Sequence, residues 1–132
     1  MAEHHEFGKT SLKRMEDMHP DLARVFHKAL KYSQFDFGVT EVKRSVEQQR
    51  INIAKGVSWS MDSQHFPDED GLVWAGDIAV YVEGKITWEG KYYRKVMQAF
   101  IRAAIEEGVQ VEFGGLWLSV EDYPHIAMVK YG

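Results

Sequence analysis

Apolar residues recur at helical spacing in two long stretches of the chain. The first stripe consists of Leu22, Val25, Phe26, Ala29 and Leu30, and Pro20 suits the first position of its helix. The second consists of Tyr93, Val96, Met97, Phe100, Ile101, Ala104 and Ile105, and Gly108 suits its end. A short helix around Leu12 and Met15 is expected before Pro20. A fourth helix is expected from Ser45, which has capping-box spacing, to Gly56.

Alternating or continuous apolar runs predict strands elsewhere. We expect strands over 35–42, 72–82, 109–113 and 126–129, with a turn at Glu83 and Gly84. The stretch from Ser58 to Gly71 is polar and irregular. Helices cluster early and strands late, so the fold class is α+β, with a small antiparallel sheet, N-terminal helices and one long central helix. A length of 132 residues predicts a single domain over 1–132.

Composition narrows the classes of function. The net charge of -4 argues against nucleic acid as the main partner, because phosphate binding usually needs a basic patch. The absence of cysteine excludes disulfides and thiolate metal ligands. The N-terminus lacks the apolar core of a signal peptide, and no apolar run approaches the ~18–20 residues of a membrane span. We therefore expect synthesis in the cytosol and no stable membrane insertion.

Two histidines and an aspartate from separate segments are candidate metal ligands. Catalytic zinc takes three protein ligands and leaves one position open for water. The candidates are His65 in the polar stretch, Asp77 in a predicted strand and His125 just before the last strand. On spacing alone, the favoured interpretation is that His65 and His125 are ordinary surface or core residues. The other histidines lie near the N-terminus or on predicted helices, without a cluster of ligands.

Asp122 precedes His125 by three residues and is a candidate general base. Glu121 competes for that role, but neighbouring side chains in an extended segment point to opposite sides. Taken without the rest of the sequence, Glu121 and Asp122 are better interpreted as a solvated acidic turn.

Several segments together resemble the zinc peptidases that cut peptidoglycan stem peptides. That family includes D-Ala-D-Ala carboxypeptidases and dipeptidases, and the closest likeness is to the L-alanyl-D-glutamate endopeptidases that tailed phages use as endolysins. The motifs are Ser63-Gln64-His65, Ala75-Gly76-Asp77 and Asp122-Tyr123-Pro124-His125. The run 84–88, the Phe113-Gly114-Gly115 approach with Trp117, and Lys43-Arg44-Ser45 also resemble family segments, in the family's order.

The resemblance implies a hedgehog or D,D-peptidase-like fold and a role for each matched residue. His65, Asp77 and His125 would bind one Zn²⁺ ion, and Asp122 would be the catalytic base. Arg44 would orient the substrate or polarise its carbonyl, since a guanidinium is permanently charged and planar. Without the family, Arg44 is an exposed arginine at a helix start. Ser63 would hydrogen-bond substrate or only cap a turn.

The chain departs from the family pattern between the first histidine and the aspartate. The residues from Phe66 to Trp74 make this spacing longer than usual and include Pro67-Asp68-Glu69-Asp70-Gly71. Asp68 or Asp70 could therefore replace Asp77 as the second ligand, although the apolar run after Asp77 favours Asp77. The insertion could form a lid, bind Ca²⁺ or be a solvated loop. Leu116 is a second departure, because many relatives carry a polar residue there.

The resemblance implies a zinc metallopeptidase that hydrolyses the L-alanyl-D-glutamate bond of the stem peptide. The alternatives are a D,D-carboxypeptidase or dipeptidase on peptidoglycan precursors, and a non-catalytic zinc-containing module that binds the cell wall. The implied setting is host lysis by a monomer. The protein would be made in the bacterial cytoplasm and act on the wall in the periplasm, and a separate membrane-permeabilising partner would give it access.

Overall fold

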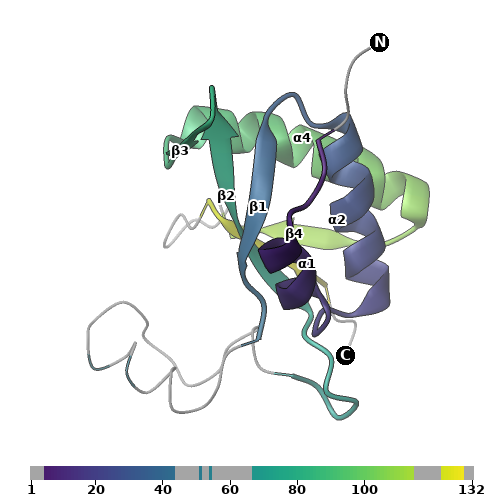
Figure 1. Cartoon of the computed structure of the whole chain (residues 1–132). Coiled ribbons are helices and arrows are strands. Elements are labelled where there is room, and N and C mark those ends of the chain that lie inside the picture. The colour runs from purple at the N-terminus through teal and green to yellow at the C-terminus, as the bar shows by residue number, and fades with distance from the viewer. Residues whose placement is uncertain (1–4, 44–50, 52–53, 55–66, 115–122, 130–132) are drawn as a thin grey trace.

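The computed structural model describes residues 5–43, 51, 54, 67–114 and 123–129 of the chain. Three helices and five strands have defined bounds, as Figure 1 shows. The helices are α1 (Lys9–Met15), α2 (Pro20–Tyr32) and α4 (Gly90–Glu107). The strands are β1 (Asp36–Glu41), β2 (Ala75–Val82), β3 (Lys85–Thr87), β4 (Val111–Phe113) and β5 (His125–Met128). The predicted α+β class is confirmed.

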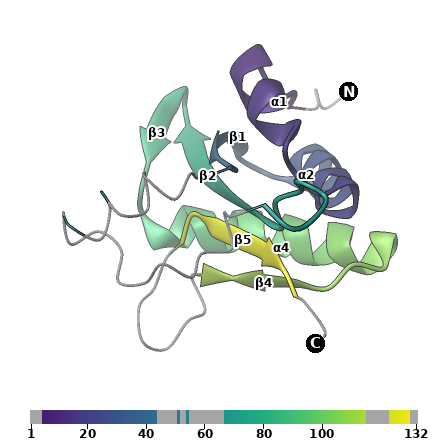
Figure 2. The same cartoon turned by 90° about the horizontal axis from the view of Figure 1, so that it is seen from below.

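The strands form one antiparallel sheet in the order β1-β2-β5-β4, and β3 pairs with β2 on the same edge as β5, beyond the end of β5. Figure 2 shows β4 and β5 side by side, with α4 lying along the sheet. The strand β5 comes last in the chain but lies between β2 and β4. The position of β5 between β2 and β4 brings the C-terminal segment against β2, the strand that carries Asp77.

Aromatic side chains join the two long helices to one face of the sheet. Phe100 of α4 contacts Phe26 of α2, with ring centroids 4.9 Å apart, and Phe37 of β1, with centroids 5.2 Å apart. All three rings are fully buried. A side chain at Gly76 would meet Phe26 at 2.8 Å, so β2 also lies directly against α2. Because side chains alternate along a strand, Asp77, Ala79 and Tyr81 face away from these helices.

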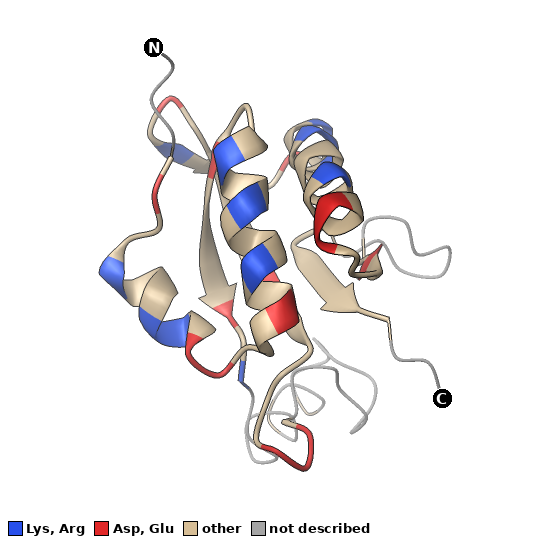
Figure 3. Cartoon of the chain, turned by 90° about the vertical axis from the view of Figure 1, so that its right-hand side faces the viewer, with Lys and Arg blue, Asp and Glu red and all other residues tan. Residues whose placement is uncertain are grey.

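The outer surfaces of α2 and α4 carry charges of both signs, as Figure 3 shows. Arg24 and Lys28 of α2 form ion pairs with Glu107 of α4, at 3.2 Å and 3.1 Å. Surface pairs of this kind, here partly buried, contribute little to stability, roughly 0–1 kcal/mol each. The buried aromatic contacts therefore hold the two helices together, and the charges fix their surface register.

The helix ends follow the sequence signals. The helix α2 begins at Pro20, and the Nδ1 atom of His19 accepts a hydrogen bond from the Asp21 N–H at 3.1 Å. The helix α4 ends before Gly108, which has a left-handed φ of 68° that glycine adopts without strain. The helix α4 begins at Gly90, three residues before Tyr93, the first residue of the predicted apolar stripe. No helix in the described parts of the chain is long and apolar enough to cross a membrane.

The bounds of the predicted strands need correction, and one strand was not predicted. β1 and β4 are shorter than the predicted 35–42 and 109–113. β2 begins at Ala75 instead of Leu72, because Val73 forms a parallel bridge with Met18. β5 begins at His125 itself, one residue earlier than predicted. β3 was not predicted at all, because its three residues are largely exposed and show no apolar pattern. Most of the helix predicted from Ser45 lies outside the described residues, although Ile51 and Ala54 are helical.

Candidate active site

Asp77 and His125 face each other across neighbouring strands. They are register partners in the antiparallel pairing of β2 with β5. The Nδ1 atom of His125 lies 3.1 Å from the Oδ1 atom of Asp77. The His125 side chain is 6% exposed and that of Asp77 is 20% exposed. The pair is therefore held by the sheet and reached by solvent mainly from the Asp77 side.

The segment that enters β5 is fixed on both sides. The Ile78 N–H of β2 donates a hydrogen bond to the Pro124 carbonyl at 2.9 Å. The Arg94 Nη2 atom of α4 donates to the Tyr123 hydroxyl at 2.8 Å. Gly90 lies under the Tyr123 ring, where an added Cβ would come within 2.7 Å. These contacts set the position from which His125 enters the sheet.

The Oδ1 atom of Asp77 and the Nδ1 atom of His125 are spaced as two ligand atoms of one zinc ion would be. Tetrahedral zinc with bonds of 2.0–2.1 Å places its ligand atoms about 3.3 Å apart. The observed separation of 3.1 Å is close to that value. Within the described ranges, no group of three potential metal ligands occurs. The third predicted ligand, His65, lies outside them.

The acidic insertion organises its own loop. Oδ1 of Asp68 accepts hydrogen bonds from the N–H groups of Asp70 and Leu72, each at 2.9 Å. Oδ2 of Asp68 accepts one from the Trp74 indole N–H at 2.7 Å. The Leu72 and Trp74 donors hold the pKa of the Asp68 carboxyl below its ordinary value. The structure thus brings Asp77 beside His125. The Asp68 carboxylate instead accepts hydrogen bonds from Asp70, Leu72 and Trp74. The Ca²⁺ site stays a prediction.

The remaining predicted site residues, Arg44, Ser63, His65 and Asp122, lie outside the described residues. Glu41 at the end of β1 is the register partner of Asp77. The chain therefore passes the Asp77–His125 pair shortly before it continues to Arg44. Sequence reasoning missed Gly90 and Arg94 as supports of the His125 segment. A glycine at the first position of a helix was the one available signal.

Comparisons with known proteins agree with this arrangement. The chain is similar to a crystal structure of the Serratia marcescens L-Ala D-Glu endopeptidase ChiX, with a TM-score of 0.84 and 34% identity. That match covers 94% of this chain and 90% of the other. The chain is also 35% identical over 122 residues to the L-alanyl-D-glutamate peptidase of Escherichia phage T5, covering 89% of this chain and 85% of the relative.

The fold and the paired side chains thus place the chain among peptidases. The model of the phage L-alanyl-D-glutamate peptidase family matches residues 4–130. The chain belongs to this family, which confirms the resemblance seen in its motifs.

Proposed function

We propose that this protein is a zinc-dependent endopeptidase that hydrolyses the L-alanyl-D-glutamate bond of peptidoglycan stem peptides. The observation that carries the proposal is the Asp77–His125 pair, aligned by β2 and β5 in a chain that belongs to the family from residue 4 to 130. The names of the phage T5 and Serratia marcescens relatives support the choice of bond.

Asp77 and His125 would hold the metal together with His65. Bound zinc supplies Lewis acidity, which makes a peptide carbonyl more electrophilic and nearby water more acidic. The burial of His125 and its place in the sheet hold the imidazole in one orientation, which favours a fixed ligand geometry. The 20% exposure of the Asp77 side chain leaves an approach for substrate from that side.

The other predicted residues would handle protons and orientation. Asp122 would accept a proton from the attacking water and deliver one to the leaving amine. Arg44 would pair with a substrate carboxylate or with the carbonyl oxygen. Ser63 would donate a hydrogen bond to the peptide. The Pro124 and Tyr123 contacts support this division of roles, because they fix the chain one residue after Asp122.

Digestion of purified peptidoglycan tests the choice of bond. The zinc-loaded protein is expected to release fragments with a free amino group on D-glutamate and with D-Ala-D-Ala intact. Release of D-alanine would instead identify a D,D-peptidase. Binding of the wall without any new terminus would identify a non-catalytic module. Asp122→Ala is the matched variant, and we expect it to keep zinc and fold but to lose hydrolysis.

We further propose host lysis as the setting, on the strength of the phage members of the family. The protein would act as a monomeric endolysin on the wall in the periplasm. A separate membrane-permeabilising partner would let it leave the cytoplasm. Expression in the bacterial cytoplasm with and without membrane permeabilisation tests this, since lysis is expected only in the permeabilised cells.

A further inference from the structure

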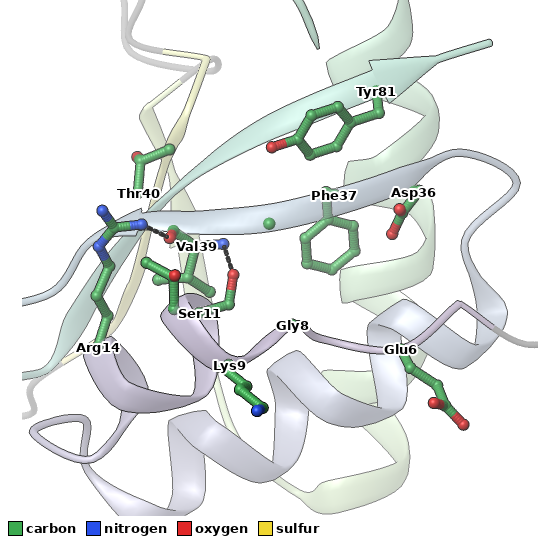
Figure 4. A pocket seen from close by; sticks show the side chains of 12 residues that line it. Glu6, Gly8, Lys9, Ser11, Arg14, Asp36, Phe37, Val39, Thr40 and Tyr81 are labelled. Carbon is green, nitrogen blue, oxygen red and sulfur yellow. Dashed lines mark hydrogen bonds between the residues drawn. The ribbon is translucent and has the colours of Figure 1, made fainter. Parts of the chain in front are cut away.

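A groove runs along the outer edge of β1. Its volume is about 430 Å³, and it lies between β1 and the stretch that contains α1 (Figure 4). Its walls are the residues 36–40 of β1, several residues from Glu6 to Arg14, and Tyr81 of β2. The groove involves none of the residues assigned to the metal or to the proposed catalytic steps.

Part of the β1 edge is closed by α1 and part is open. The Val39 N–H donates to the Ser11 hydroxyl at 3.0 Å, and Arg14 Nη1 donates to the Val39 carbonyl at 2.8 Å. Backbone groups of alternate residues point outward from an antiparallel edge, so those of Phe37 also point into the groove. Within the described residues, no partner occupies the Phe37 N–H and C=O. An extended peptide can pair with such an edge.

The absence of a side chain at Gly38 makes room on the same surface. A Cβ there would lie 3.2 Å from the Ser11 hydroxyl oxygen and 3.6 Å from the Tyr81 ring. Glycine therefore lets Ser11 reach the strand edge and lets the Tyr81 ring form one wall. The Tyr81 hydroxyl oxygen would lie 3.7 Å from the same Cβ, so Ser11 and Tyr81, both labelled in Figure 4, border one space beside Gly38.

The register of β1 with β2 connects the groove to the Asp77–His125 pair. Asp36 is opposite Tyr81, and Glu41 is opposite Asp77. Asp77 and Tyr81 lie on the same face of β2, four residues apart, which is about 13 Å along a strand. The Val39–Thr40 end of the groove is therefore nearer to the pair, and the Asp36 end is farther away. Three or four residues of extended peptide span this distance.

Charges change sign along the groove. Arg14 lies at the near end with Thr40, whereas Asp36 and Glu6 lie at the far end (Figure 4). Lys9 adds a second cation to the lining. Neither Asp36 nor Glu6 forms an ion pair within the part of the chain that the structure describes. The far end therefore offers carboxylates for a ligand cation.

We propose that this groove is a substrate subsite that recognises an ammonium-bearing residue beyond the scissile bond. The inference rests on the proposed function, in which an anionic D-glutamyl residue directly follows the cleaved bond. That residue would lie toward the cationic end. The chain that follows it would extend along the β1 edge and place its side-chain ammonium at the end of the groove that Asp36 and Glu6 line. A peptide with an anionic residue followed by a cationic one would match the charge order of the groove.

Two synthetic peptides test the subsite. Both contain L-alanyl-D-glutamate followed by a residue with a side-chain amine, which is free in one peptide and acetylated in the other. We expect the zinc-loaded wild-type protein to favour the free amine by roughly fivefold in kcat/KM, as befits exposed ion pairs. Asp36→Asn and Glu6→Gln should each reduce this preference through KM, with kcat unchanged. Higher salt should reduce it as well.

Glu16→Gln is the matched control. Glu16 is an exposed acid at the end of α1 outside the groove lining, so this variant should keep the full preference. Asp36→Lys provides a second test, because it should shift the preference toward a peptide with a carboxylate in place of the amine. An unchanged preference in Asp36→Asn and Asp36→Lys would overturn the subsite and leave the proposed function standing. Cleavage of neither peptide by wild type would overturn the proposed function and the subsite with it.

Discussion

At the scale of single residues, the site depends on which carboxylate stands beside His125. Asp77 is the register partner of His125 and lies 3.1 Å from it. Asp68 is an acid of the insertion in the same part of the sequence, but its oxygens accept three hydrogen bonds within the loop. The two aspartates therefore offer a matched pair of substitutions.

We expect Asp77→Asn to lower zinc affinity by at least tenfold, because a neutral amide replaces an anionic ligand. Zinc content after dialysis against a chelator measures this. Asp68→Asn should keep zinc and activity and lower only the melting temperature. Loss of zinc in Asp68→Asn, with zinc retained in Asp77→Asn, would identify the insertion as the source of the second ligand.

The lowered pKa of the Asp68 carboxyl also predicts that the stability of the fold depends on pH. Its folded-state pKa is lowered by the N–H donors of Leu72 and Trp74, so the carboxylate stabilises the fold above its unfolded-state pKa, near 4. This contribution is lost as the pH falls below about 4 and through the lowered folded value. Thermal melts between pH 7 and pH 2 should therefore show a smaller acid-induced decrease for Asp68→Asn than for wild type. Equal decreases would contradict the assignment.

At the scale of elements, the start of α4 supports the segment that leads into β5. Gly90 lies under the Tyr123 ring, and Arg94 donates a hydrogen bond to the Tyr123 hydroxyl. Tyr123 stands two residues before His125 in the chain. The first turn of α4 thus acts on the site through Tyr123, although it contributes no proposed ligand.

Gly90→Ala should lower activity more than stability. Its added Cβ would lie only 2.7 Å from the Tyr123 ring, so the ring and the segment that leads to His125 would have to move. Gly76→Ala is the contrasting variant, because its Cβ would come within 2.8 Å of Phe26 and Met18 in the core. We expect it to destabilise the fold by about 1–3 kcal/mol. Urea denaturation and the rate of peptide cleavage separate the two effects. Full activity in a folded Gly90→Ala protein would argue against support of the site by α4.

At the scale of the whole molecule, the sequence predicted elements better than their pairing. The apolar stripes of α2 and α4 and the glycine at 108 carry strong local signals, and the structure confirms them. β3 carries no such signal, because its short and exposed residues are ordered by pairing with β2. The order β1-β2-β5-β4 follows from how the strands meet in the folded chain, which no local pattern records.

In the candidate site, too, the sequence indicated single residues but not how strand pairing brings them together. Motifs identified Asp77 and His125 as candidates, but their distance of 3.1 Å follows from the pairing of two strands that are far apart in sequence. The structural role of Asp68 was equally hidden, because it depends on the closure of one loop around one carboxylate. His65, Arg44, Ser63 and Asp122 stay predictions.

We propose that one zinc ion, held by Asp77 and His125 with His65, enables cleavage of the L-alanyl-D-glutamate bond. Titration of the metal-free protein with zinc, while the free amino groups of D-glutamate are measured, tests it most directly. We predict no cleavage without metal and a rise that reaches a plateau at one equivalent of zinc per chain. Full cleavage by the metal-free protein, or no new D-glutamate terminus at any zinc concentration, would contradict the account.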